Sequence, residues 1–248
     1  MSPAGQQILD HLARVERLRL ARADDPAQTE RVQAVKAYQA RRFERGYADL
    51  LADARYCRAA RFFLDELYGP QEFAARDAQF ARIVPALVRM FPDEIVRTVA
   101  ALARLHALSE DLDDTMARQL DAPAIDAAVY RALWQRTGRA QDRQAQIDLT
   151  IQIGEALDHY TRSHFLRGAL RMMRQPARAA GLGELQRFLE VGFETFGSMK
   201  GAQTFLGTVR QREEALANAL FDGGAITSAT TSSGTAPMDP FAALGQLP

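Results

Sequence analysis

The chain has 248 residues, of which 47% are hydrophobic and 25% charged, so it is long enough for one substantial core and ordinary for a globular protein. Lysine plus arginine equals aspartate plus glutamate at 31 each, which argues against non-specific binding of nucleic acid or of an anionic membrane. The single cysteine, Cys57, excludes an internal disulfide framework and a cysteine-based zinc cluster.

The sequence shows no recognisable signal for secretion or for membrane insertion. Its first residues contain no basic region followed by an apolar run, so we expect no signal peptide. No window approaches about 20 continuous apolar residues, so we expect no membrane span. The default compartment is therefore the cytoplasm.

Helical periodicity begins near the start of the chain. Apolar residues at three- and four-residue steps predict a helix over residues 6–22, which the sequence Asp24-Asp25-Pro26 breaks. A second helical pattern runs over residues 29–68. Gly46 lies inside it, and we expect one continuous helix with a bend there, because glycine costs about 1 kcal/mol in a helix relative to alanine.

The next two helical patterns are punctuated by prolines. Residues 72–90 predict a helix with a kink or restart near Ile83, because Pro85 removes one backbone hydrogen bond and clashes one turn back. The sequence Phe91-Pro92-Asp93-Glu94 predicts a helix start. Ser109 suggests a joint before a further helix over residues 110–120.

The second half of the chain continues the pattern. We expect a short helix from Asp121 to Gly138, a long one over residues 141–174 that ends at Gln175-Pro176, and helical segments over residues 185–197 and 199–221. Within the long helix, Gly154 and Gly168 would let a neighbouring helix pack closely.

No period-two alternation persists anywhere in the chain, so the sequence predicts an all-α fold. We expect a single multi-helix bundle over residues 1–221, with seven or eight helices, some of them long and kinked. Residues 222–248 are rich in serine, threonine and glycine and predict a disordered tail, which carries a short apolar patch at residues 238–244.

The densest aromatic cluster lies at residues 58–70 and ends in Gly69-Pro70. We expect it to be a structural hub on which other helices pack, formed by Phe62, Phe63, Asp65, Glu66, Leu67 and Tyr68. Asp65 and Glu66 stand in the last turn of a helix, where the negative end of the helix dipole disfavours carboxylates. We therefore expect an arginine partner for them, drawn from Arg58, Arg61 and Arg76.

An acidic run suggests a metal site. Glu110, Asp111 and Asp114 match the spacing of the motif with which isoprenoid synthases hold Mg²⁺ through a substrate diphosphate, and carboxylate oxygens suit that ion. The second acidic motif of those enzymes is missing. The alternative is that these carboxylates stabilise a helix N-terminus.

Two histidines offer a different chemistry. His106 and His164 follow apolar residues by helical steps, and with the nearby Tyr160 they are candidates for ligand binding. Inward histidines on separate helices can ligate haem iron or another metal. The alternative is a buried, hydrogen-bonded histidine at each position.

The segment Phe62-Phe63-Leu64-Asp65-Glu66-Leu67-Tyr68-Gly69 resembles the signature of an uncharacterised bacterial family described by its Phe-Phe-Leu-Glu-Glu-Leu-Tyr motif. Asp65 stands where that pattern has glutamate. The resemblance extends over the helical region to about Phe221 and implies a soluble helical bacterial protein with no established activity. It supplies no catalytic residue.

The sequence thus favours a non-enzymatic helical protein that binds a partner protein, a second copy of itself or a ligand, with no nucleic acid expected. The alternative is a helical pocket protein for haem, a metal or an isoprenoid-like apolar ligand, including a Mg²⁺-dependent enzyme that uses the acidic run. The cofactor is left open by the sequence. We predict no catalytic residue.

Overall fold

The computed structural model describes residues 2–66 and 73–221, and that part of the chain contains eleven α-helices and no strand. The count exceeds the expected seven or eight because several long patterns are divided. The helices are α1 (Pro3–Ala23), α2 (Pro26–Gly46), α3 (Ala48–Ala52), α4 (Cys57–Glu66), α5 (Ala74–Met90), α6 (Asp93–Ala117), α7 (Ala127–Thr137), α8 (Ala140–Tyr160), α9 (His164–Ala179), α10 (Gly183–Ser198) and α11 (Gln203–Phe221).

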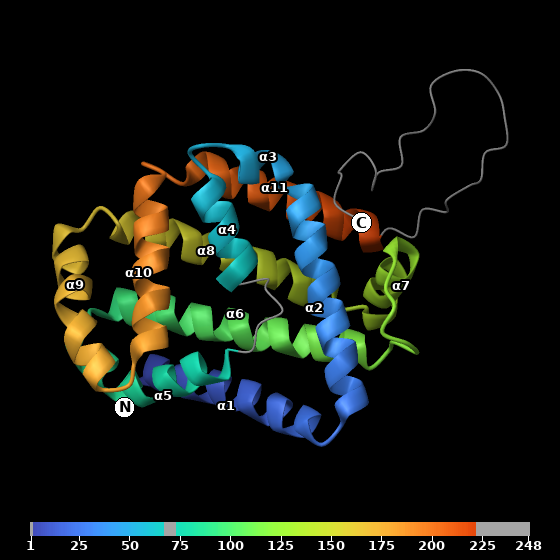
Figure 1. The fold of residues 1–248 in the computed structure, drawn as a ribbon, viewed down its shortest axis with the longest axis horizontal. Helices are drawn as coiled ribbons and strands as arrows, with labels where there is room; N and C mark the ends of the chain where they lie inside the picture. The colour runs from blue at the N-terminus through green and yellow to red at the C-terminus, as the bar shows by residue number, and fades with distance from the viewer. Residues whose placement is uncertain (1, 67–72, 222–248) are drawn as a thin grey trace, which may run out of the picture.

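The helices form two crossed layers (Figure 1). Helices α1, α6, α8 and α11 lie one beside the next with roughly aligned axes, α8 running opposite to the others, and each contacts its neighbour in that order. Helices α2, α4 and α10 cross over them, while α9 and α7 lie at opposite ends. None of the described helices is long and apolar enough to span a bilayer. The predicted tail and the Leu67–Pro70 part of the hub lie outside the described residues.

The expected continuous helix over residues 29–68 is wrong, because the chain turns twice within it. Helix α2 ends at Gly46, so this glycine marks a terminus and not a bend. Asp53 then adopts an extended backbone, and its side chain accepts the backbone N–H groups of Arg55 and Tyr56 at 2.7 and 3.1 Å. A carboxylate that binds nearby backbone N–H groups competes with helix continuation.

The expected helix over residues 141–174 is divided in the same way. Ser163 accepts the backbone N–H of Leu166 at 3.3 Å and begins α9 as an N-cap. No helix ends at Gln175-Pro176 as expected, because Pro176 lies inside α9. Pro85 likewise lies inside an unbroken α5, without the restart expected near Ile83.

Three other helix ends differ from the sequence prediction. Helix α6 runs through Ser109 without a joint, since the Ser109 hydroxyl accepts a hydrogen bond from Gln146 at 2.8 Å. Helix α7 begins after Asp126, whose carboxylate caps it, and not at Asp121, while its end before Gly138 (φ 62°) is as predicted. A positive φ at Gly201 forms the turn before α11, which therefore begins at Gln203.

Aromatic side chains from α2, α4, α10 and α11 fill the largest part of the core, which we call the aromatic core. Its fully buried rings include Phe43, Phe63, Phe196 and Phe205, together with Tyr47 at the junction of α2 and α3. Phe63 lies 5.3 Å from Phe205 and 6.3 Å from Phe196 between ring centroids. Phe62, its neighbour in α4, packs on Phe188 of α10 at 5.7 Å. Helix α4 thus joins α10 to α11.

Candidate ligand-binding cavity

A cavity of about 130 Å³ lies where α1, α2, α5, α6, α8 and α10 converge. Most of its wall is apolar and includes Phe80, Leu87, Val99, Leu102, Leu105 and Phe188. Polar side chains form the remainder, and they include Lys36, Gln39, Asp77, His106, Glu110 and Asp113. Glu66 and Phe73 border the cavity from either side of residues 67–72, which lie outside the described part of the chain.

Lys36 and Glu110 form the first polar part of the wall. The Lys36 ammonium binds one Glu110 oxygen, and Arg22 Nη2 binds the other at 2.8 Å. All three side chains are at most 8% exposed. Burial alone would raise the pKa of the Glu110 carboxyl, but the adjacent Lys36 and Arg22 outweigh it and lower the pKa to about 2. Glu110 is therefore an anion that holds two buried cations together.

These cations keep hydrogen-bond donors to spare. Among the described residues, Glu110 is the hydrogen-bond partner that Lys36 Nζ finds, although an ammonium carries three N–H donors. Arg22 Nη1 is also buried without a partner in the described part of the chain. Because Lys36 borders the cavity, its remaining donors can serve an acceptor placed there.

Asp113 lies one turn after Glu110 and has a different environment. Its carboxylate accepts an amide N–H from Gln39 at 2.9 Å, and no ion pair to it is seen among the described residues. Burial is the dominant influence and raises the pKa of the Asp113 carboxyl, although Lys36 and Arg143 oppose it. Two neighbouring carboxyl groups thus differ in the direction of their pKa shifts.

The second polar part of the wall is built on Asp77. Its Oδ2 accepts from Arg19 Nη2 and lies 2.9 Å from His106 Nε2. Burial would raise the pKa of Asp77, yet the hydrogen bonds from His106 and Arg19 and the nearby Arg76 charge lower it. Glu66, next along the wall, pairs with Arg187 at 2.8 Å and with Arg76 at 3.4 Å.

Glu66 has the arginine partner that the sequence predicts for a carboxylate in the last turn of a helix. Arg76 is one of the three arginines expected as partners, whereas Arg187 comes from α10 and was not anticipated. Asp65, the other carboxylate, is exposed. Leu67 and Tyr68 lie outside the described residues.

The structure separates the three ligand-binding candidates. His106 borders the cavity, but His164 is exposed at the start of α9. Tyr160 places its hydroxyl 2.9 Å from Thr98 Oγ1 and is not part of the cavity wall. The two histidines are therefore not positioned to ligate one haem iron, and the cavity is smaller than the roughly 300–1,000 Å³ of typical cofactor pockets.

The acidic run is divided among different basic partners. Asp111 pairs with Arg14 at 3.0 Å and with Arg139 at 2.6 Å. Asp114 pairs with Arg118 at 2.9 Å, and Glu110 with the buried cations described above. No group of three or more His, Cys, Asp or Glu side chains among the described residues could hold a metal ion. Spacing along one helix could not reveal that neighbouring helices supply cations to this face.

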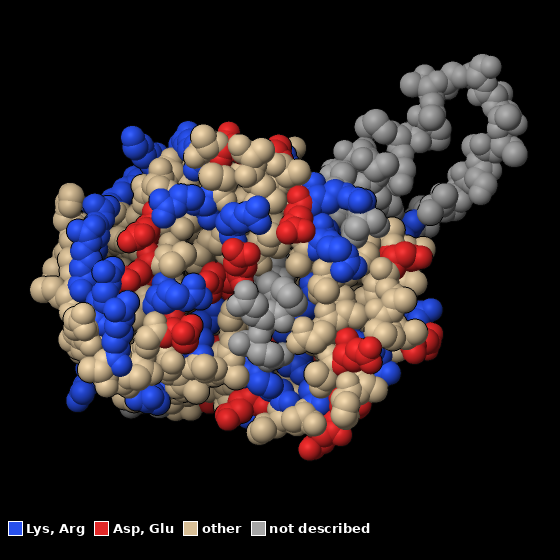
Figure 2. Space-filling view, viewed as in Figure 1, with Lys and Arg blue, Asp and Glu red and all other residues tan. Residues whose placement is uncertain are grey.

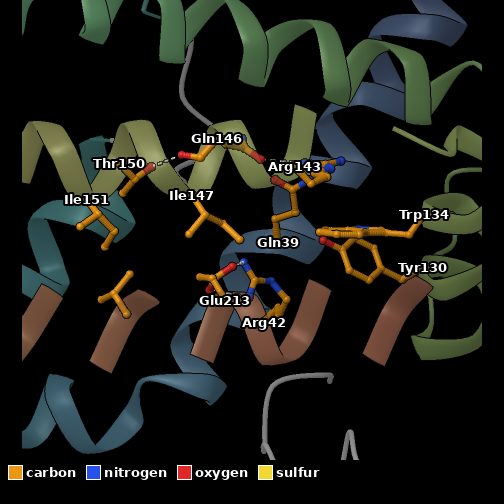
Figure 3. A pocket seen from close by; sticks show the side chains of 11 residues that line it. Gln39, Arg42, Tyr130, Trp134, Arg143, Gln146, Ile147, Thr150, Ile151 and Glu213 are labelled. Atoms are coloured by element: carbon orange, nitrogen blue, oxygen red, sulfur yellow. Dashed lines mark hydrogen bonds and ion pairs between the residues drawn. The ribbon is translucent and has the colours of Figure 1, made fainter. Parts of the chain in front are cut away.

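A second, smaller cavity of about 30 Å³ lies beyond Gln39, Gln146 and Thr150, which line both cavities (Figure 3). It has room for about one water molecule. On its far side, Arg42 binds Glu213 with two hydrogen bonds of 2.9 and 3.1 Å. The guanidinium of Arg143, another residue of this wall, lies 4.4 Å from the Trp134 ring centroid. The side-chain amides of Gln39 and Gln146 thus lie at the boundary between the two cavities.

Sequence reasoning missed Lys36 and Gln39, although a signal for them exists. Each stands four residues after an apolar residue of the α2 stripe, Val32 and Val35 respectively, which places both on the buried side of the helix. Lys36 is also one of only two lysines in the chain, the other being Lys200. A charged residue within an apolar stripe indicates a buried partner or a ligand.

Comparison with known proteins gives a family but no function. The chain belongs to the family described as a domain of unknown function, DUF8198, whose model matches residues 18–226. No curated protein and no solved structure matches the chain.

Proposed function

We propose that this member of the DUF8198 family is a binding protein for a small molecule with an apolar body and a hydrogen-bond-accepting head group. The observation that carries the proposal is the cavity itself, because apolar side chains form most of its wall while the Lys36 ammonium retains donors beside it. Of the two binding roles that the sequence leaves open, a partner protein or a ligand, this proposal takes the ligand and specifies its chemical class. We also infer that residues 62–69 are a signature of the family.

The size of the cavity limits the apolar body. An engineered protein cavity of about 150 Å³ accepts benzene, so about 130 Å³ suits a single ring or a short branched chain. Transfer of such a body from water is favourable at about 25 cal/mol per Å² of apolar surface. A larger ligand would require the surrounding helices to move apart.

The charges determine the head group. Lys36 and Arg22 carry two positive charges against the one negative charge of Glu110, and burial raises the pKa of the nearby Asp113 carboxyl. A carboxylate, carbonyl or hydroxyl oxygen would accept from Lys36, whereas an ammonium group would add a third cation to the same buried region. We therefore expect acceptors to bind and cations to be rejected.

A matched series of ligands tests this proposal. Toluene, benzyl alcohol, benzoate and benzylamine share one ring and differ in the head group. Isothermal titration calorimetry is expected to show benzoate or benzyl alcohol binding most tightly, toluene more weakly and benzylamine most weakly. Tightest binding of benzylamine, or no binding by any of the four, would overturn the proposal.

Two variants with matched controls locate the binding. Ala103→Leu adds volume inside the cavity and is expected to abolish binding of every ligand, whereas Ala78→Leu, on the exposed side of α5, leaves it unchanged. Lys36→Met is expected to remove the preference for benzoate over toluene, and Lys200→Met to keep it. In Lys36→Met the Glu110 carboxylate keeps its pair with Arg22, so the change leaves no buried charge unmatched.

A further inference from the structure

Helix α9 has an unusual charge distribution. Its sixteen residues include no aspartate or glutamate, but four arginines at positions 167, 171, 174 and 178. Steps of four, three and four residues place these arginines along one side of the helix. Figure 2 shows the resulting column of basic side chains at the end of the molecule where Figure 1 places α9.

Apolar side chains on the same helix remain open to solvent. Phe165 and Met172 are 75% and 74% exposed, the highest values for large hydrophobic residues in the described part of the chain, and Met173 is 46% exposed. Phe165 and Met172 are seven residues apart and so lie on one side, two turns apart. Large apolar side chains exposed along one side of a helix are a feature of interaction surfaces.

The protein itself pairs only part of this surface, since Arg167 donates to the Thr161 carbonyl at 2.7 Å. Helix α9 packs on α10, where Gln186 donates to the Leu170 carbonyl at 2.7 Å and Glu190 pairs with Arg174 at 2.9 Å. Arg171 and Arg178 form no ion pair with the described residues. The outer part of α9 thus presents one arginine row and one apolar row, separated by small and polar side chains.

We propose that α9 binds an anionic membrane surface, with Phe165 and Met172 inserted at the headgroup boundary and the arginines against the lipid phosphates. Charge complementarity supports this occupant, because the helix has four cations and no anion. The apolar residues form a ridge on one convex helix, which suits a deformable bilayer surface more than a rigid partner that would need a matching groove. Amphipathic helices that lie on membranes combine the same two features.

The zero net charge of the chain does not oppose this inference, although it led us to expect no anionic membrane binding. Screening limits the reach of surface charges to about 8 Å at physiological ionic strength. The acidic residues on distant faces therefore do not cancel the field of the arginine row. The inference also stands apart from the proposed ligand, since α10 lies between α9 and the cavity and no α9 residue lines that cavity.

Vesicle flotation with the full chain tests the proposal. We expect binding to vesicles of equal parts phosphatidylcholine and phosphatidylglycerol, none to pure phosphatidylcholine, and weaker binding as salt is raised. Arg171→Gln/Arg178→Gln is expected to weaken binding by about fivefold for each arginine removed. The control Arg97→Gln/Arg136→Gln removes two exposed arginines from α6 and α7 and should bind like the parent.

The apolar row needs its own comparison. Phe165→Ser/Met172→Ser is expected to reduce vesicle binding, whereas Leu20→Ser/Met90→Ser, which changes two other exposed apolar residues, is not. Circular dichroism checks that all variants are folded. Equal binding to both vesicle types, equal losses in variants and controls, or binding to soluble polyglutamate as tight as to anionic vesicles would overturn the membrane assignment.

Discussion

Helix α2 contributes to two regions that are held together by different forces. Its first half faces the interface with α1 and α6, where Lys36 and Arg22 meet Glu110, and which we call the charged interface. Its second half supplies Phe43 to the aromatic core, and Tyr47, directly after the helix, packs there as well. The aromatic core also contains one ion pair, Arg42–Glu213, to which the Tyr47 hydroxyl donates at 2.8 Å.

The comparison explains where the cavity lies. Aromatic rings can approach one another at several angles, so they fill the volume between α4, α10 and α11. Charged side chains are held by directional hydrogen bonds near 2.8–2.9 Å and cannot move to fill a gap without losing them. The charged interface borders the larger cavity with unused donors, whereas the aromatic core borders a cavity of only about 30 Å³.

The first prediction concerns the aromatic core. Phe63→Ala removes a side chain that is 2% exposed and contacts two other rings, so we expect a loss of about 3–5 kcal/mol in the free energy of unfolding. Urea denaturation measures the loss. Phe165→Ala deletes the same atoms from an exposed site and should change stability by less than about 0.5 kcal/mol. Similar losses from both variants would contradict the assignment of α4 as a hub.

The second prediction concerns the charged interface. Glu110→Leu leaves Arg22 and Lys36 buried without their shared anion, and we expect a loss of about 3–5 kcal/mol, again from urea denaturation. We expect that further substitutions can restore the stability lost in Glu110→Leu, unlike the stability lost in Phe63→Ala. The triple variant Arg22→Met/Lys36→Met/Glu110→Leu should recover stability close to that of the parent, because it removes all three desolvated charges. A triple variant no more stable than the single one would show that the ions contribute more than mutual neutralisation.

The third prediction separates the two carboxyl groups by pH. The folded pKa of Glu110, about 2, is below its ordinary value of 4.5, so its stabilisation is present above pH 4.5 and is lost as pH falls toward 2. The effect is on the order of 3 kcal/mol. The difference in melting temperature between the parent and Glu110→Gln should therefore shrink over this range.

The pKa of Asp113 is shifted in the direction opposite to that of Glu110, so its effect on stability changes with pH in the opposite sense. Its folded pKa is raised, so its contribution to stability is lost as pH rises through its ordinary range, and Asp113→Asn should be more stable than the parent at pH 7. Asparagine can still accept the Gln39 amide. A destabilised Asp113→Asn at pH 7 would contradict the burial argument.

The smallest effect is expected at a close helix contact. A Cβ at Gly154 of α8 would lie 2.5 Å from Leu206 Cδ2 of α11, whereas a Cβ at Gly207 meets nothing within 4 Å. We expect Gly154→Ala to cost about 1–2 kcal/mol, since crowding exceeds the gain in helix propensity. Gly207→Ala should stabilise by about 0.5–1 kcal/mol, as measured by thermal denaturation. Equal gains at both positions would show that Leu206 moves aside freely.

Much of the fold follows from the sequence. The period of the apolar residues determines the all-α class, and local signals at Pro92 and Gly138 predict the start of α6 and the end of α7 correctly. Gly154 packs closely against a neighbouring helix as predicted, whereas Gly168, for which the same was expected, has no neighbour within 4 Å of an added Cβ. A glycine in a helical pattern reveals that a close approach is allowed, but not that one occurs.

Local caps that apolar periodicity does not register divide the long helices, whereas tertiary structure alone decided the site. Asp53 and Ser163 end apolar patterns that continue past them, because their side chains bind backbone N–H groups that a longer helix would use. The same limit applies to the acidic run, whose three carboxylates belong to one short segment but pair with cations from different elements. Periodicity reports which side of a helix is buried. It does not report what lies against that side, because the facing side chains come from elements distant in the sequence.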